Sequence, residues 1–174
     1  MITASHNPPQ YNGMKMVRQE SRPISSDTGL LAIEERAASG EFVRTGAGSR
    51  EDKDVYADFV QHLLAIVPPS ELKPLRVLAD PGNGAAGVAM DALIPHLPVI
   101  VEKLRWEPDG HFPYGVPNPI LEEARAMTVE ALASGSYDFG VAWDGDYDRC
   151  FFLDETGQFI EGYYLVGLLS QALL

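Results

Sequence analysis

The sequence predicts an α/β protein built on mixed, largely parallel sheets with helices on both faces. From residue 75 onward, short apolar runs alternate with segments of helical periodicity, which is the pattern of parallel βαβ units. Turns rich in Asp, Gly and Pro follow several of these runs. In sheets of this kind the loops at the carboxyl ends of the strands carry the functional groups. These two observations set both the fold class and the places where a site is expected.

The first fifty residues are expected to be less regular. Apolar and basic residues alternate over 14–17, directly after the turn signal Asn12-Gly13, and this alternation predicts a short strand. A helix is expected over 29–39, closed by Gly40.

A longer helix is expected over 54–67, where apolar residues recur at helical spacing until Pro68-Pro69 ends the run. We place a domain boundary in or near this helix, because the alternation of strands and helices begins beyond it. The later elements are predicted in the order strand 75–79, helix 85–97, strand 98–101, helix 118–134, strand 137–143, strand 150–153 and an apolar helix 163–174.

The composition excludes some classes of function. A formal net charge of −12 argues against a general binder of nucleic acid or of anionic membranes. The apolar stretch 163–174 is shorter than the ~20 residues of a membrane-spanning helix. The only cysteine, Cys150, rules out an intrachain disulfide and fits a reducing, cytoplasmic compartment. We expect Cys150 to be a buried strand residue rather than a nucleophile. Cations that could still bind a phosphorylated metabolite are Lys15, Arg18, Arg22 and Arg149.

The most distinctive segment is the acidic turn from Asp144 to Arg149. Asp144, Asp146 and Asp148 occupy alternate positions between two predicted strands, beside the guanidinium of Arg149. When the backbone curves around an ion, carboxylates at this spacing converge on it, and hard oxygen ligands suit Mg²⁺. The turn therefore predicts a magnesium site.

The acidic turn has three other interpretations. An EF-hand loop is excluded, because Arg149 stands where that loop requires glycine and because strands rather than helices flank the turn. A phosphatase of the haloacid-dehalogenase type, with Asp144 as nucleophile, fits in part and stays open. A solvated acidic turn without a ligand is the third interpretation, and the glycine and arginine within the turn weigh against it.

A second candidate site is the hydroxyl of Ser5. The proline pair Pro8-Pro9 and the following Asn-Gly turn predict a rigid, exposed loop that could present this hydroxyl to a substrate. His6 is adjacent in sequence, and we expect neighbours not to reach each other as nucleophile and base, so a hydrolase triad is not predicted. Lys15 lies ten residues further on and carries an amine that can move a proton at a sugar hydroxyl.

The glycine-rich segment 81–87 resembles a phosphate cradle only superficially. It lacks the Lys-Ser/Thr pair of a P-loop and the spacing of a dinucleotide fingerprint. We therefore expect a tight, structural strand-to-helix turn.

Taken together, these motifs resemble the α-D-phosphohexomutases, and within that family the bacterial phosphomannomutases that supply mannose 1-phosphate for GDP-mannose. The serine loop and the triple-Asp loop are highly specific in combination. The matching segments are Thr3–Pro8, Tyr11–Lys15, Arg22–Ser25, Gly82–Gly87, Asp109–Pro113, Asp144–Arg149 and Gly162–Tyr164.

The resemblance implies a mechanism. A phosphoserine at Ser5 would pass its phosphoryl group to a hexose phosphate, giving a hexose 1,6-bisphosphate that returns its other phosphate to the serine. Mannose 6-phosphate and mannose 1-phosphate, and also glucose phosphates, are the implied substrates. The implied roles are Mg²⁺ ligands for Ser5, Asp144, Asp146 and Asp148, acid/base for Lys15, phosphoryl partner for Arg149, and support of the serine loop for His6 and Asn7.

The resemblance covers only part of the family's length, so we expect a partial multi-domain phosphohexomutase architecture. Residues 1–53 would be the C-terminal part of a first domain, 54–155 a second domain and 156–174 the start of a third. This extent predicts that the chain is a fragment of a working mutase. The competing hypothesis is a non-catalytic remnant that binds magnesium or a phosphosugar.

Overall fold

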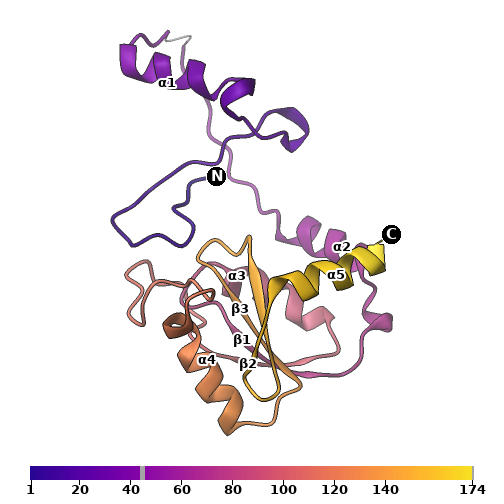
Figure 1. Ribbon diagram of the computed structural model, residues 1–174. Coiled ribbons are helices and arrows are strands. Elements are labelled where there is room, and N and C mark those ends of the chain that lie inside the picture. The colour runs from indigo at the N-terminus through magenta and orange to yellow at the C-terminus, as the bar shows by residue number, and fades with distance from the viewer. Residues whose placement is uncertain (44–45, 174) are drawn as a thin grey trace. The chain divides into compact units, whose positions relative to one another are not determined.

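A computed structural model describes residues 1–43 and 46–173 (Figure 1). The chain divides into two compact units. The smaller unit contains Met1–Thr3 and Asn12–Asp54, and the larger contains Ala4–Tyr11 and Val55–Leu174. The loop that carries Ser5, Ala4–Tyr11, is therefore part of the larger unit, although the residues on either side of it belong to the smaller unit.

In the smaller unit the main element is helix α1, Leu30–Ser39, which ends as predicted at Gly40 in the left-handed conformation, with φ of 69°. Two 3-10 helices, Gln19–Ser21 and Ser26–Thr28, precede it. The strand predicted over 14–17 is wrong. Met14 and Val17 each form only an isolated bridge, to Ile2 and Pro23 respectively. The segment thus changes its pairing partner between these residues, and no continuous ladder forms.

The larger unit is built on a five-stranded sheet in the order β2-β1-β3-β4-β5. β1 is parallel to both β2 and β3, whereas β4 and β5 extend the sheet in antiparallel fashion. The elements are α2 Tyr56–Ile66, β1 Arg76–Asp80, α3 Ala86–Leu93, β2 Ile100–Lys103, α4 Glu122–Ser134, β3 Phe139–Trp143, β4 Cys150–Asp154, β5 Phe159–Ile160 and α5 Gly162–Leu173, with 3-10 turns at Pro69–Glu71 and Ile94–His96.

The core lies on both faces of β1, because side chains alternate along a strand. Val77 packs on one face, in a cluster with Val141 of β3 and with Met90 of α3 at its edge. Leu78 packs on the other face against Leu132 of α4. Helices therefore cover both faces of a mixed α/β sheet, and the predicted fold class is confirmed.

Several boundaries differ from the prediction. Helix α4 begins at Glu122 rather than at 118, because Asn118 to Leu121 form a turn of their own, closed by the Leu121 N–H on the Asn118 carbonyl at 2.9 Å. β2 lies two residues later than expected, and the short β5 was not predicted. Cys150 begins β4 as a strand residue, but it is exposed rather than buried.

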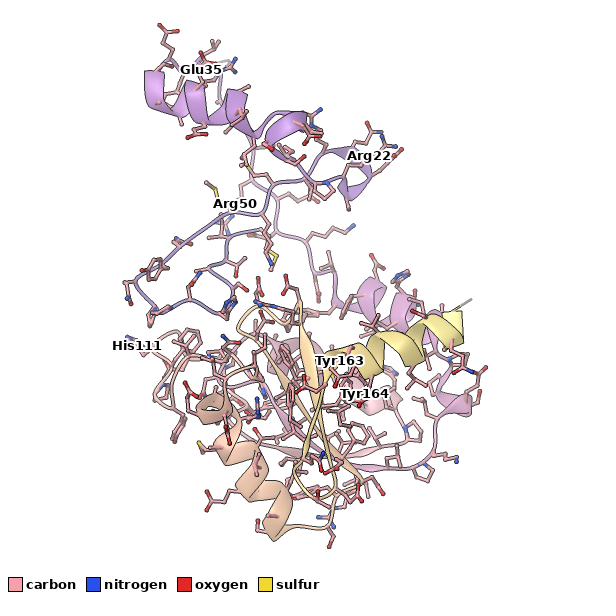
Figure 2. All side chains as sticks on the ribbon, viewed as in Figure 1. Arg22, Glu35, Arg50, His111, Tyr163 and Tyr164 are labelled. Carbon is pink, nitrogen blue, oxygen red and sulfur yellow. The ribbon has the colours of Figure 1, made fainter. Side chains whose placement is uncertain are left out.

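The predicted C-terminal helix is present as α5, and position 174 lies outside the described residues. Its tyrosines Tyr163 and Tyr164 are both 65% exposed (Figure 2), as is Val166. None of the helices in the described part of the chain has the length and apolar character needed to cross a membrane.

Candidate active site

The acidic turn Asp144–Arg149, here termed the aspartate loop, forms a tight hairpin at the carboxyl end of β3. Trp143 and Cys150 are the last pair of the β3–β4 ladder, and the loop between them is closed from both sides. The Asp144 N–H donates to the Arg149 carbonyl at 3.3 Å, and the Arg149 N–H donates to Asp144 Oδ1 at 3.1 Å. At the tip, Tyr147 has a left-handed φ of 49°, and burial, with a smaller contribution from Tyr56, raises its pKa.

The three aspartates of this loop lie together, as their spacing predicts. Each contributes one carboxylate oxygen to a group whose atoms all lie within 4.8 Å of one another. Asp144 and Asp146 are buried, at 1% and 6% exposure, whereas Asp148 is exposed. Hard oxygens that converge at this separation could hold a divalent metal ion, and their chemistry fits Mg²⁺.

Ser5 lies against the first of these aspartates. Its Oγ donates a hydrogen bond to Asp144 Oδ2 at 3.1 Å and accepts one from Arg149 Nη2 at 2.5 Å. The loop around Ser5 is closed by the Asn7 N–H on the Ala4 carbonyl at 3.0 Å. The structure thus brings the predicted hydroxyl to the predicted carboxylate.

His6 corrects one expectation from the sequence. Its Nδ1 lies 3.2 Å from Ser5 Oγ, so these neighbours do reach each other. Ser5 has a left-handed φ of 57°, which differs from the extended backbone that would point adjacent side chains to opposite sides. The three groups still do not follow the order of a hydrolase triad, because Asp144 contacts the hydroxyl itself.

Arg149 connects the two loops. Its Nη2 forms an ion pair with Asp144 Oδ2 and lies 2.5 Å from His6 Nδ1, and its Nε lies 3.3 Å from Asp148 Oδ1. The Arg149 side chain is 36% exposed, so it is accessible from solvent. A planar fork of donors beside a hydroxyl is well suited to the oxygens of a phosphoryl group.

The remaining predicted cations belong to the smaller unit. Lys15 has an exposed side chain, and its backbone N–H donates to the Met1 carbonyl at 2.9 Å. Arg22, which is labelled in Figure 2, has an exposed side chain. Its Nη2 forms an ion pair with Glu20 at 2.7 Å. The acid/base role of Lys15 therefore stays a prediction.

Sequence reasoning missed the role of the glycines around the site. The turn at 81–84 is more than a strand-to-helix connection, because it touches the aspartate loop. The Ala85 N–H donates to the Gly145 carbonyl at 3.0 Å, and a Cβ at Gly84 would lie 2.8 Å from that same oxygen. A Cβ at Gly145 would collide with the Ser5 carbonyl oxygen. Glycine between two of the aspartates was the signal available in the sequence.

Comparisons with known proteins identify the family of the chain. The family model for phosphoglucomutase/phosphomannomutase α/β/α domain II matches residues 54–157, and that for domain I matches residues 1–44. A protein of Xanthomonas campestris named phosphohexose mutases is 55% identical over 100% of this chain and 39% of its own length. A phosphomannomutase of Vibrio cholerae is 46% identical over 99% of this chain and 39% of its own length.

Solved structures give the same result. A phosphoglucomutase/phosphomannomutase family protein of Burkholderia thailandensis superimposes with a TM-score of 0.84 at 31% identity, over 98% of this chain and 37% of that one. A structure titled putative phosphomannomutase from Thermus thermophilus gives 0.82 at 28% identity, over 99% of this chain and 40% of that one. The chain therefore spans about two fifths of the length of these relatives. Since the domain II model alone matches residues 54–157, the chain belongs to the phosphoglucomutase/phosphomannomutase family.

Proposed function

We propose that this protein interconverts hexose 6-phosphates and hexose 1-phosphates, mannose phosphates foremost, through a phosphoserine at Ser5. The observation that carries the proposal is the position of the Ser5 hydroxyl, 3.1 Å from Asp144 Oδ2 and 2.5 Å from Arg149 Nη2. Relatives named phosphomannomutase support mannose phosphate as the substrate. The mannose 1-phosphate formed would serve GDP-mannose synthesis, in the reducing cytoplasm that a single cysteine suits.

The aspartate loop is the proposed magnesium site. The carboxylates of Asp144, Asp146 and Asp148, together with an oxygen on the Ser5 side chain, would hold the ion. A bound Mg²⁺ would neutralise negative charge on the phosphoryl group during its transfer. Burial of two of the three carboxylates supports the proposal, because two buried carboxylates at close range carry more negative charge than the single guanidinium of Arg149 balances.

The first transfer moves the phosphoryl group from Ser5 to the free hydroxyl of the bound sugar phosphate. The bond between Ser5 Oγ and phosphorus breaks, and the departing serine oxygen takes up a proton from solvent. The bond between the sugar oxygen and phosphorus forms, and Lys15 takes the proton of the sugar hydroxyl. Arg149 donates hydrogen bonds to the phosphoryl oxygens during this loose, in-line displacement. The product is a hexose 1,6-bisphosphate.

The second transfer runs in the opposite direction after the bisphosphate has turned round. Ser5 Oγ forms a bond to the phosphorus of the other phosphate and releases its proton to solvent. The sugar oxygen that loses this phosphoryl group regains a proton from Lys15. His6, 3.2 Å from Ser5 Oγ, and the turn closed by the Asn7 N–H keep the serine oriented in both steps. Positioning and electrostatics carry the catalysis, as is usual for phosphoryl transfer.

The phosphatase alternative is less well supported. A nucleophilic carboxylate needs an oxygen that is open to the substrate. Asp144 is 1% exposed, and its Oδ1 accepts the Arg149 N–H while its Oδ2 accepts the Ser5 hydroxyl. A binder without catalysis is the other alternative, and the experiment below distinguishes it.

The test is conversion of mannose 1-phosphate to mannose 6-phosphate by the protein as its own cells make it, with Mg²⁺ and a trace of hexose 1,6-bisphosphate, followed by ³¹P NMR. We expect turnover, and a loss of more than about 10³-fold in Ser5→Ala, since removal of a covalent nucleophile has effects of this size or larger. The matched control is Ser136→Ala, an exposed serine, which should leave turnover unchanged. Normal turnover in Ser5→Ala would contradict the phosphoserine, and binding without turnover in the wild type would favour the non-catalytic binder.

A further inference from the structure

A buried polar cluster lies at the carboxyl end of β1, outside the site described above. Asp80 is 1% exposed, and its Oδ2 accepts hydrogen bonds from Arg105 Nη2 at 2.5 Å and Thr128 Oγ1 at 2.6 Å. Its Oδ1 accepts from Arg105 Nε at 3.0 Å and from the Gly82 N–H at 2.9 Å. Arg105 is 6% exposed and also donates to the Ala124 carbonyl at 3.1 Å. Both charges of this pair are therefore out of water and hydrogen-bonded.

This cluster holds the glycine-rich turn that follows β1. The carboxylate of Asp80 fixes the Gly82 N–H, and the Arg105 carbonyl accepts the Asn83 N–H at 2.8 Å. Gly82 has a left-handed φ of 59° and packs so closely on Pro117 that a Cβ would lie 2.6 Å from the proline Cβ. The turn thus has little freedom to move while the Asp80–Arg105 pair is intact.

The glycine-rich turn also supports the aspartate loop. β1 and β3 are parallel and pair Asp80 with Ala142, so their carboxyl ends lie side by side. The Ala85 N–H donates to the Gly145 carbonyl, and Gly84 packs directly on Gly145. Gly145 also packs on the Ser5 carbonyl. A continuous chain of close contacts therefore runs from Asp80 to the loop that carries the carboxylates and to the serine.

We propose that Asp80 is a positioning residue for the metal-binding loop, acting through its ion pair with Arg105 and through the glycine-rich turn. This inference rests on the proposed function, because it assumes that the loop binds a divalent cation. A purely stabilising role would not need a buried ion pair, since such pairs often stabilise a fold no more than apolar side chains of similar volume do. The pair instead fixes a carboxylate against a backbone amide at one defined place, which an apolar substitute could not do.

Two variants weaken the cluster to different degrees. Asp80→Asn keeps the volume and removes the charge, whereas Thr128→Val keeps the ion pair and removes only the 2.6 Å hydrogen bond. The control is Leu132→Ala, which opens a cavity in the core between α4 and the sheet, where Leu132 packs with Leu78 and Leu153. If Asp80→Asn fails to fold, Thr128→Val decides the question.

The readouts are the Kd for Mn²⁺ by titration and the backbone hydrogen exchange of residues 144–149 in the metal-free chain. Outer residues that orient metal ligands typically change affinity by 10- to 100-fold. We expect a rise in Kd of about tenfold for Asp80→Asn and about threefold for Thr128→Val, each with faster exchange in the loop. Leu132→Ala should lower the melting temperature while its Kd stays within about twofold of the wild type.

The outcomes separate this inference from the proposed function. Wild-type binding of Mn²⁺ with an unchanged Kd in Asp80→Asn and Thr128→Val would overturn the positioning role and leave the metal site intact. An equal rise of Kd in Leu132→Ala would also overturn it, because general destabilisation would then account for the effect. No Mn²⁺ binding by the wild type would overturn the proposed metal site, and the positioning role with it.

Discussion

Ser5 Oγ donates a hydrogen bond at 3.1 Å to Oδ2 of Asp144, a residue 139 positions further along the chain. The backbones of the two loops are also in close contact, because Gly145 packs on the Ser5 carbonyl with no room for a Cβ. The segment Ala4–Tyr11 therefore belongs to the same compact unit as the aspartate loop, even though its flanking residues do not. A hydroxyl and a carboxylate cluster held in this way form one site. Its metal binding and its close packing can each be tested by a separate experiment.

Magnesium should stabilise the protein through the aspartate loop. At a free concentration 100 times the Kd, a ligand that binds only the folded state raises the free energy of unfolding by about 2.7 kcal/mol. We expect Mg²⁺ to raise the melting temperature accordingly, and EDTA to reverse the rise. Asp146→Asn should lose most of this shift, whereas Glu130→Gln, an exposed carboxylate on α4, should keep it. Equal shifts in both variants would contradict a site at this loop.

Gly145→Ala should impair both folding and turnover. The added methyl group would collide with the Ser5 carbonyl oxygen, which is backbone and cannot swing aside. Overpacking of this kind costs about 1–3 kcal/mol in the free energy of unfolding. Activity should fall further than stability predicts, because the collision separates the hydroxyl from Asp144. The control is Gly110→Ala, where a Cβ would meet nothing within 4 Å. Equal stability and activity of the two variants would refute the close contact.

Asp91 gives a prediction about pH. The hydrogen bond from Lys103 Nζ at 2.5 Å holds the pKa of Asp91 below its usual value of 3.8, burial opposes this, and the Trp106 Nε1 donor assists it. A lowered folded pKa means that the pair stabilises the fold above the unfolded pKa and loses this effect as pH falls through the folded one.

The expected contribution of this pair is small, about 0.2–1 kcal/mol, because both side chains are substantially exposed. Urea unfolding of the wild type and of Asp91→Asn should therefore differ by this amount at about pH 6 and converge towards about pH 3. A difference that stays constant or grows on acidification would contradict the assignment.

The parts of the fold that the sequence predicts well are those whose residues are both locally patterned and central. β1 and β3 are continuous apolar runs that end in turn signals, and they form the middle of the sheet. The strand expected over 14–17 had the right alternation, but alternation does not supply a neighbouring strand to pair with. Asn118-Pro119 resembled a helix start, yet the chain makes a separate turn there before α4 begins.

The candidate site divides in the same way. The three aspartates are close in sequence, so their convergence could be predicted from spacing alone. The contact between Ser5 and Asp144 could be expected only through the family resemblance, because no local pattern links residues so far apart. The Asp80–Arg105 pair could not be predicted at all. A lone aspartate before a Pro-Gly turn gives no sign of its partner, and Arg105 lies in a loop whose course depends on the packed sheet.

The most direct test of the account is to locate the phosphate on the protein itself. The purified protein is incubated with Mg²⁺ and a labelled hexose 1,6-bisphosphate, and the bound phosphate is mapped by mass spectrometry before and after treatment with hydroxylamine, which cleaves an aspartyl phosphate and spares a phosphoserine. We expect one phosphate, on Ser5, resistant to hydroxylamine and absent from Ser5→Ala. A hydroxylamine-sensitive phosphate on Asp144, or no phosphate on the protein at all, would contradict the phosphoserine mechanism.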